Sequence, residues 1–189
     1  MKACFVFVAL ALTACQNTTF EHPPVAETAC VPALAGDWLS QGVANESDGE
    51  VELSIDQQCR LEVLEHEQDG LRRGESTVLH GGKDHEQGYL WVDAAWANQR
   101  FESKHAAPAG DVYVLRYRLD GNSLQMRLPD DKAIAHLIID GKLQGEVQRN
   151  VDGLFNRILG QLPAGQLRRH DLFTGEVARF KRRLPEVPR

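Results

Sequence analysis

The segment from His80 to Glu86 holds the densest group of side chains that could bind a metal ion. It reads His-Gly-Gly-Lys-Asp-His-Glu, and a strand pairing could bring His66 beside His80 and His85. Imidazole nitrogens and carboxylate oxygens together suit zinc or copper. The alternative is a solvated loop between two strands, which short motifs of this kind usually prove to be. We therefore predict no metal site and no cofactor.

The sequence also lacks the short patterns that mark common catalytic sites. It contains no Gly-x-Ser-x-Gly elbow, no His-Glu-x-x-His pair and no phosphate-binding glycine loop. The chain has 21 basic and 27 acidic residues, which gives a net charge of −6 at pH 7. Such an acidic balance argues against nucleic acid as a partner. We predict a protein that is not an enzyme and has no catalytic residues.

The N-terminal residues have the layout of a secretory signal. Lys2 is followed by an apolar run that ends in Leu-Thr-Ala-Cys at Cys15. The run is too short to span a bilayer, which takes about 20 apolar residues. Its ending resembles the lipobox of bacterial lipoproteins. The resemblance implies that residues 1–14 are removed and that acyl chains on Cys15 hold the protein on a lipid membrane; an ordinary signal peptide with a chance cysteine is the alternative.

The residues after Cys15 indicate a destination and a domain organisation. In lipoprotein sorting of the enterobacterial kind, an Asp after the acylated cysteine often marks the inner membrane, so Gln16 implies the periplasmic face of the outer membrane. Residues 15–29 are polar and contain proline, which is typical of a tether. We expect one domain over residues 30–184, followed by a short tail at 185–189.

The remaining cysteines indicate a disulfide. Cys4 leaves with the signal segment, whereas Cys30 and Cys59 stay in the domain. In an oxidising compartment we expect these two to be bonded to each other. Closing a loop of about 30 residues would contribute roughly 3 kcal/mol. Two free thiols are the alternative.

Alternating apolar and polar residues predict a domain that is mainly β. Val51, Leu53 and Ile55 show this alternation, and Asp120-Gly121-Asn122 marks a hairpin, with further turns at Asp69-Gly70 and Gly81-Gly82. Strands are expected near 37–43, 50–56, 59–66, 75–80, 88–96, 111–119, 123–128, 143–149 and 177–184. Short helices are expected at 131–140, 151–160 and 164–173, before the last strand. Hairpin-linked strands favour a small antiparallel up-and-down barrel, which leaves no open sheet edge.

The first expected strand begins with Gly36-Asp37-Trp38. A Gly-x-Trp at this place resembles the signature of lipocalins and other calycins. The resemblance implies that Trp38 plugs the barrel base and that an arginine of the last strand packs over it. The candidates for that arginine, among which the sequence does not choose, are Arg179, Arg182 and Arg183.

Three further segments resemble small lipocalin-like lipoproteins of the proteobacterial cell envelope. They are the hairpin at 117–124, the segment at 141–147 and the basic final strand at 180–183. The resemblance covers about residues 33–183 and implies a lipocalin-like barrel that is located in the cell envelope. A shared fold does not by itself imply a ligand.

Aromatic and aliphatic side chains on the expected inward faces could line a ligand pocket. The candidates are Leu115, Tyr113, Tyr117 and Met126, together with the aromatic residues Tyr89, Trp91, Trp96 and Phe101. On this hypothesis the barrel binds a small apolar or lipid-like ligand. The alternative is that these side chains fill the interior, as in other small barrels. The chain would then be a non-catalytic module for protein interaction or envelope assembly.

Two surfaces are candidates for partner binding. If Leu90 faces the interior, Tyr89 and Trp91 lie outside and could form a partner patch. The basic residues at 168–169 and 179–183 could face anionic lipid head groups, or could be ordinary solvated surface.

The lipobox leads to a test on the intact protein. Protein purified from its native membrane should begin at Cys15, carry the mass of its acyl chains and contain the Cys30–Cys59 bond. Intact-mass spectrometry with and without reduction measures all three. Protein that begins at Met1, or that lacks fatty-acyl mass, would contradict the lipoprotein hypothesis.

Overall fold

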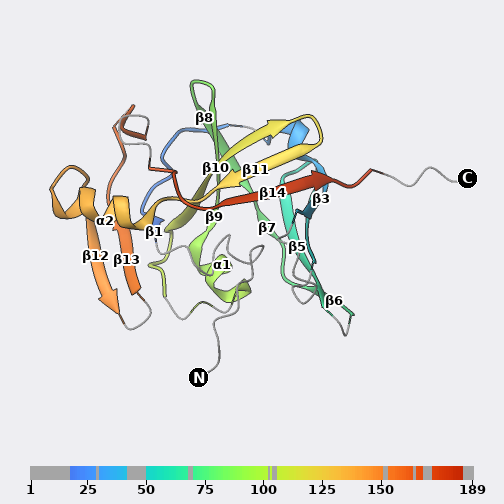
Figure 1. Cartoon of the computed structure of the whole chain (residues 1–189), viewed down its shortest axis with the longest axis horizontal. Helices are drawn as coiled ribbons and strands as arrows, with labels where there is room; N and C mark the ends of the chain where they lie inside the picture. Colours follow the sequence, from blue (N-terminus) through green and yellow to red (C-terminus); the bar gives the residue numbers. More distant parts are fainter. Residues whose placement is uncertain are drawn as a thin grey trace, which may run out of the picture.

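A computed structural model describes residues 18–28, 30–41, 50–67, 70–101, 103, 106–150, 153–163, 165–167 and 172–184. The signal segment, Cys15 and the tail at 185–189 lie outside these residues. Figure 1 shows the elements in order. They are β1 (Thr18–Phe20), β2 (Glu27–Thr28), a 3₁₀ helix (Pro32–Leu34), β3 (Gly36–Ser40), β4 (Glu50–Ile55), β5 (Arg60–Glu67), β6 (Gly70–Arg73), β7 (Thr77–Val78), β8 (His80–Asp84), β9 (Gln87–Asp93), α1 (Ala94–Arg100), β10 (Val112–Asp120), β11 (Ser123–Arg127), α2 (Asp131–Ile139), β12 (Gly145–Asn150), β13 (Gly153–Ile158) and β14 (Val177–Arg182).

The sheet curls on itself, so the predicted mainly β class, consistent with a small antiparallel barrel, is confirmed. The last strand, β14, pairs with β11 and with β3, and the order continues through β4 to β5. On the other side of β11 the order runs through β10 and β9 to β8. Residues 77–84 join the two ends, because β7 pairs with β5 and β8 pairs with β9. The N–H of Leu79 also donates to Cys59 O at 2.8 Å.

The interior of this curl is a continuous apolar core. Alternate residues of its strands point inward, as the sequence pattern predicted for β4. The core is closed on one side by the 3₁₀ helix and on another by α1, which buries Ala94 and Ala97. The strand expected at 88–96 ends at Asp93, because the Asp93 carboxylate accepts a hydrogen bond from the N–H of Trp96 at 2.7 Å and caps α1.

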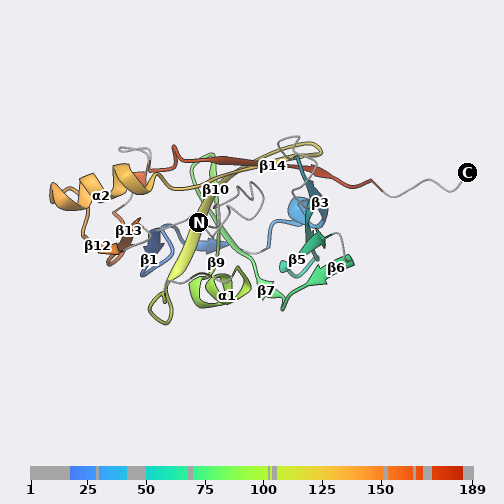
Figure 2. The same ribbon diagram turned by 60° about the horizontal axis from the view of Figure 1, so that its bottom comes forward.

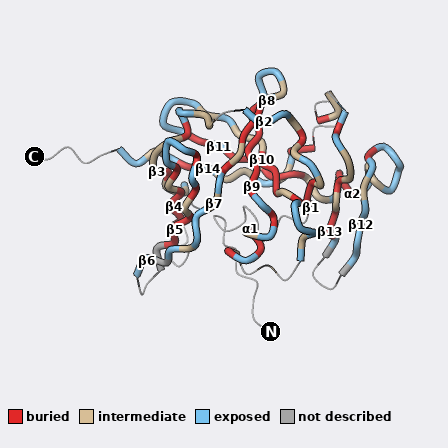
Figure 3. The backbone as a smooth tube through the Cα atoms, turned by 180° about the vertical axis from the view of Figure 1, so that it is seen from behind, coloured by how far each residue is buried: buried red, intermediate tan, exposed pale blue. Residues whose placement is uncertain are grey.

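A second layer covers the outer face of β9 and β10. It consists of β1, β12, β13 and α2, which lie together at one end of the molecule in Figures 1 and 2. Its apolar cluster includes Tyr89, Trp91 and Val114, which alternate along β9 and β10 with residues of the inner core. Figure 3 shows the long buried stretches of β9 and β10 that lie between the two layers. Both faces are therefore buried at residues 88–92 of β9 and 113–115 of β10.

The N-terminal segment belongs to the fold, although a tether was predicted over residues 15–29. Strand β1 lies between β10 and β13 and pairs in parallel with β13. Thr18, Thr19 and Phe20 are buried. Further on, β2 pairs with β8 at Gly81 and Gly82. The turn predicted at these glycines is wrong: Gly82 lies in a strand, and a Cβ there would lie 2.4 Å from Ala26 O.

The helix predicted at 151–160 is also wrong, because residues 153–158 form strand β13. Leu154, Phe155 and Ile158 have a spacing that suits either structure. The strand is favoured by its partners on both sides, β12 and β1. It also buries Asn156, whose side-chain amide donates to Thr18 Oγ1 at 3.0 Å and to Asp131 O at 2.8 Å.

The helix predicted at 131–140 is confirmed as α2, which begins and ends where capping requires. The Asp130 carboxylate accepts a hydrogen bond from the N–H of Ala133 at 2.9 Å and another from Thr174 Oγ1 at 2.9 Å. The bond from Ala133 is the main cause of a lowered pKa for Asp130. After Asp140, the positive φ of Gly141 ends the helix.

A buried ion pair connects the two layers through the N-terminal segment. The Arg157 guanidinium binds Asp111 with Nε and Nη2, at 2.9 Å from Oδ2 and Oδ1 respectively. Thr19 Oγ1 donates to the same carboxylate at 2.9 Å. Glu21 accepts from the N–H of Gly160 at 2.7 Å and lies 3.4 Å from Arg157 Nη2. The hydrogen bonds to Asp111 raise the pKa of Arg157, which keeps the guanidinium charged.

We expect Asp111→Ala to lower the free energy of unfolding by roughly 2–4 kcal/mol, because Arg157 and Thr19 both lose their buried acceptor. Urea denaturation measures the change. Asp140→Ala is the matched control: its carboxylate bonds Lys142 at 3.0 Å with both side chains more than half exposed, so we expect a change within about 0.5 kcal/mol. Equal costs for the two substitutions would contradict this account of the second layer.

Candidate functional site

The Gly36–Trp38 motif forms a closed base, and Arg182 is the arginine that covers it. Trp38 is fully buried, and its Nε1 donates to Leu34 O at 2.8 Å. Arg182 Cζ lies 4.2 Å from the centre of the indole ring, which is a cation–π distance. The Arg182 guanidinium also donates to Ala35 O and, at 2.6 Å, to Ala33 O. These bonds fix the 3₁₀ helix against the last strand.

The other two candidate arginines lie elsewhere. Arg183 Nη1 donates to Glu52 Oε2 at 2.9 Å, outside the base. Arg179 is exposed on β14. The basic residues 168–169 of the suggested lipid-facing patch lie outside the described residues, whereas Arg179 and Lys181 are exposed on β14.

The predicted disulfide between Cys30 and Cys59 is present. It connects the N-terminal segment to the turn between β4 and β5, across 29 positions of sequence. Cys59 is buried in the inner core. The bond therefore adds a covalent link close to the base formed by Trp38.

Four of the side chains predicted to line a ligand pocket are packed in the inner core. Tyr113, Leu115 and Met126 are 1, 8 and 3 % exposed, and Tyr117 packs against the same cluster. Tyr113 Oη donates to Asn98 Oδ1 of α1 at 2.9 Å. Burial raises the pKa of Tyr113 to about 12, so the phenol is neutral at physiological pH and serves as a donor. Three of the four are thus buried in the inner core, and the fourth packs against it.

Tyr89 and Trp91 do lie on the outer face of β9, with Leu90 inward as expected. The chain itself covers them. Tyr89 packs on Phe173 with ring centres 5.4 Å apart, and Trp91 stacks with His80 at 6.1 Å. Both rings are thus covered by residues of the same molecule: Tyr89 by Phe173 of the outer cluster, and Trp91 by His80 of β8.

The histidines considered as metal ligands are dispersed. His80 Nδ1 lies 2.7 Å from Glu27 Oε1, on β8 beside the N-terminal segment. His85 is exposed at the turn before β9, and the side chain of His66 lies outside the described residues. Within the part of the chain that the structure describes, no three His, Cys, Asp or Glu side chains come close enough to hold a metal ion.

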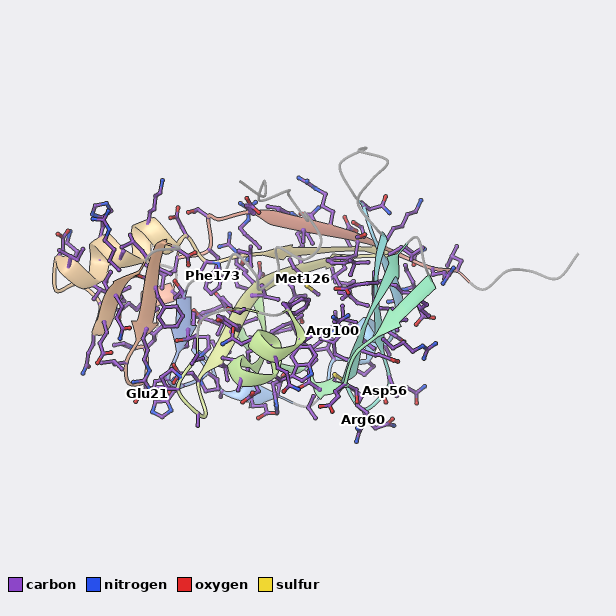
Figure 4. The ribbon with its side chains drawn as sticks, turned by 90° about the horizontal axis from the view of Figure 1, so that it is seen from below. Glu21, Asp56, Arg60, Arg100, Met126 and Phe173 are labelled. Carbon is purple, nitrogen blue, oxygen red and sulfur yellow. A yellow bond between two sulfur atoms is a disulfide. The ribbon has the colours of Figure 1, made fainter. Side chains whose placement is uncertain are left out.

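One pocket was not predicted as a whole, although its Trp96 was among the aromatic candidates for pocket lining. It has a volume of about 170 Å³ and is lined by Arg73, Gly74, Glu75, Trp96, Gln99 and Arg100. Figure 4 shows Arg100 between α1 and the strands β4–β6. Arg100 reaches the sheet because residue 74 has no side chain; a Cβ there would lie 2.4 Å from Arg100 Nε. No sequence pattern marks this site, because α1 and β6 are brought together only by the curl.

We expect Gly36→Ala to lower the free energy of unfolding by about 2–4 kcal/mol, since φ is +135° and a Cβ would lie 2.5 Å from Arg182 Nη1. Gly70→Ala is the matched control, because its φ is +133° with no atom within 4 Å of the new Cβ. It should cost about 1–2 kcal/mol. Thermal and urea unfolding measure both. Equal costs would show that contact with Arg182 contributes nothing.

No helix in the described part of the chain is both long and apolar enough to cross a bilayer. Comparison with known proteins gave no match to a family model, to a curated protein or to a solved structure. The function must therefore be inferred from the chemistry of this chain and from the geometry of its fold.

Proposed function

We propose that the chain is an exported, lipid-anchored envelope protein whose filled lipocalin-like barrel serves as a non-catalytic interaction module. One observation carries the choice between the two hypotheses from the sequence: Tyr113, Leu115 and Met126 are packed inside the core. A cup for an apolar ligand needs these side chains to border open space. A module that binds through its outer surface needs them to fill it.

The packing at the two closures supports this choice. Trp38 and Arg182 occupy the base, and α1 covers a second side through Ala97 and the bond between Asn98 and Tyr113. An apolar ligand would have to displace one of these closures to enter. The same base arrangement of Gly36, Trp38 and Arg182 supports the proposed kinship with lipocalin-like proteins.

The lipobox supports the proposed location at the membrane of the cell envelope. If Cys15 carries the acyl chains, only Gln16 and Asn17 separate it from Thr18, the first residue of β1. The three residue steps from Cys15 to Thr18 span at most about 11 Å. The domain would then lie directly on the membrane surface, with the second layer nearest the lipid. A barrel on a long tether could reach partners far from the bilayer. A domain held this close to the bilayer would instead meet mainly partners at the membrane surface.

The filled interior makes a specific prediction for stability. We expect Leu115→Ala and Met126→Ala each to lower the free energy of unfolding by about 2–5 kcal/mol, because each leaves a cavity in a packed core. In a hollow cup the same changes would cost little. Urea denaturation measures the effect, and Leu154→Ala, at a residue 36 % exposed, is the matched control with an expected cost within about 1 kcal/mol.

Two outcomes would contradict the proposed module. One is a cost at Leu115 and Met126 no larger than at Leu154. The other concerns cross-linking in intact envelopes, compared between the natural chain and Cys15→Ser. The proposal is contradicted if the natural chain gives no cross-linked adduct that the variant lacks. The substitution removes the acyl acceptor and lies outside the described fold.

A further inference from the structure

We propose that the pocket between α1 and the β6–β7 segment binds a small carboxylate joined to a flat apolar group. The pocket lies on the side of the curl, shares no lining residue with the base motif and shares only Trp96 with the predicted lining residues. This proposal goes beyond the interaction module and does not depend on lipid attachment. Its observations are a buried donor, a second cation and an ordered indole ring.

The buried donor is the Nε–H of Arg100. The Arg100 side chain is 5 % exposed, and its Nη2 donates to Val63 O at 3.1 Å and lies 3.4 Å from Glu65 Oε2. Its Nε has no hydrogen-bond partner among the described residues. Buried donors are almost always paired in folded proteins, because an unpaired one costs free energy. The Nε has less than 1 Å² of accessible surface and faces Gly74, so an acceptor on a bound molecule would remove that cost only once the Gly74 backbone moves aside slightly.

The second cation makes an anionic acceptor the better fit. Arg73 lines the same pocket with a side chain 63 % exposed, and its guanidinium lies 3.5 Å from Glu62 in a loose surface pair. Glu65 already offsets the charge of Arg100, whereas Arg73 keeps its charge available to a ligand. Guanidinium groups match the geometry of carboxylates. Glu75 is the acidic lining residue, and it is exposed to solvent.

The indole of Trp96 forms an apolar wall. Its Nε1 donates to Glu75 O at 3.0 Å, and its ring meets Phe101 edge-on at 6.3 Å, so both contacts hold its orientation. Aromatic faces favour flat apolar groups. A cavity of about 150 Å³ is known to accept benzene, so about 170 Å³ suits one aromatic ring with a carboxylate. Benzoate is therefore the appropriate probe.

The test is a titration of isotope-labelled full chain, purified in detergent, with benzoate and with neutral benzamide. We expect benzoate to shift the Trp96 indole and Arg100 Nε–H resonances saturably, and benzamide to bind at least about threefold more weakly because it lacks the charge. Arg73→Gln should weaken benzoate by about threefold and leave benzamide unchanged. Arg118→Gln, an exposed arginine of β10 that does not line the pocket, should change neither.

A second variant addresses the buried donor. Gly74→Ala places a Cβ against Arg100 Nε, so it should abolish the benzoate shifts; thermal unfolding shows whether the variant is folded. The proposal is overturned by an absence of saturable shifts, by equal affinity for benzoate and benzamide, or by an Arg73→Gln variant that binds benzoate as the natural chain does. None of these results bears on the stability costs at Leu115 and Met126, which test the proposed module separately.

Discussion

The bidentate contact between Arg157 and Asp111 is the interaction on which the second layer depends. Asp111 precedes β10 of the curled sheet, Arg157 lies in β13, and Thr19 of the N-terminal segment donates to the same carboxylate. A carboxylate that is 1 % exposed is stable as an anion only when it is paired and hydrogen-bonded. The pair therefore requires that β1 and β13 be in place. Without them the outer face of β9 and β10 would expose Tyr89 and Trp91.

The same arrangement gives the molecule two cores that share strands. Side chains of β9 and β10 alternate between the inner core and the outer cluster, so both faces are buried at residues 88–92 of β9 and 113–115 of β10. This is unusual for an antiparallel sheet, which commonly leaves one face to solvent. On the proposed function, the centre of the molecule is a scaffold. Sites for other molecules would then lie at the periphery, as the proposed site beside Trp96 does.

The sequence determined much of this by itself. Alternation along β4, β10 and β11 identified strands, because a period of two reflects a local pleat and needs no knowledge of the partner strand. The cysteine count left Cys30 and Cys59 as a pair, and Gly36 with Trp38 identified the base. An Asp at position 131 and Gly141 after the segment bounded the predicted helix at 131–140, since such end signals involve only neighbouring residues; the capping role of Asp130 was seen only in the structure.

Tertiary structure decided the features that depend on distant partners. Residues 153–158 became a strand because β1, more than 130 positions earlier in the chain, supplies hydrogen bonds on one side and buries Asn156. Of the three candidate arginines, Arg182 covers Trp38 because it is the one placed opposite Trp38 in the pairing of β14 with β3. The Arg100 pocket exists because the curl of the sheet brings α1 next to β6. Local patterns specify which conformation a segment prefers. Which distant segment it pairs with depends on the entropy lost when the intervening chain is closed into a loop and on the packing gained, and both are properties of the whole fold.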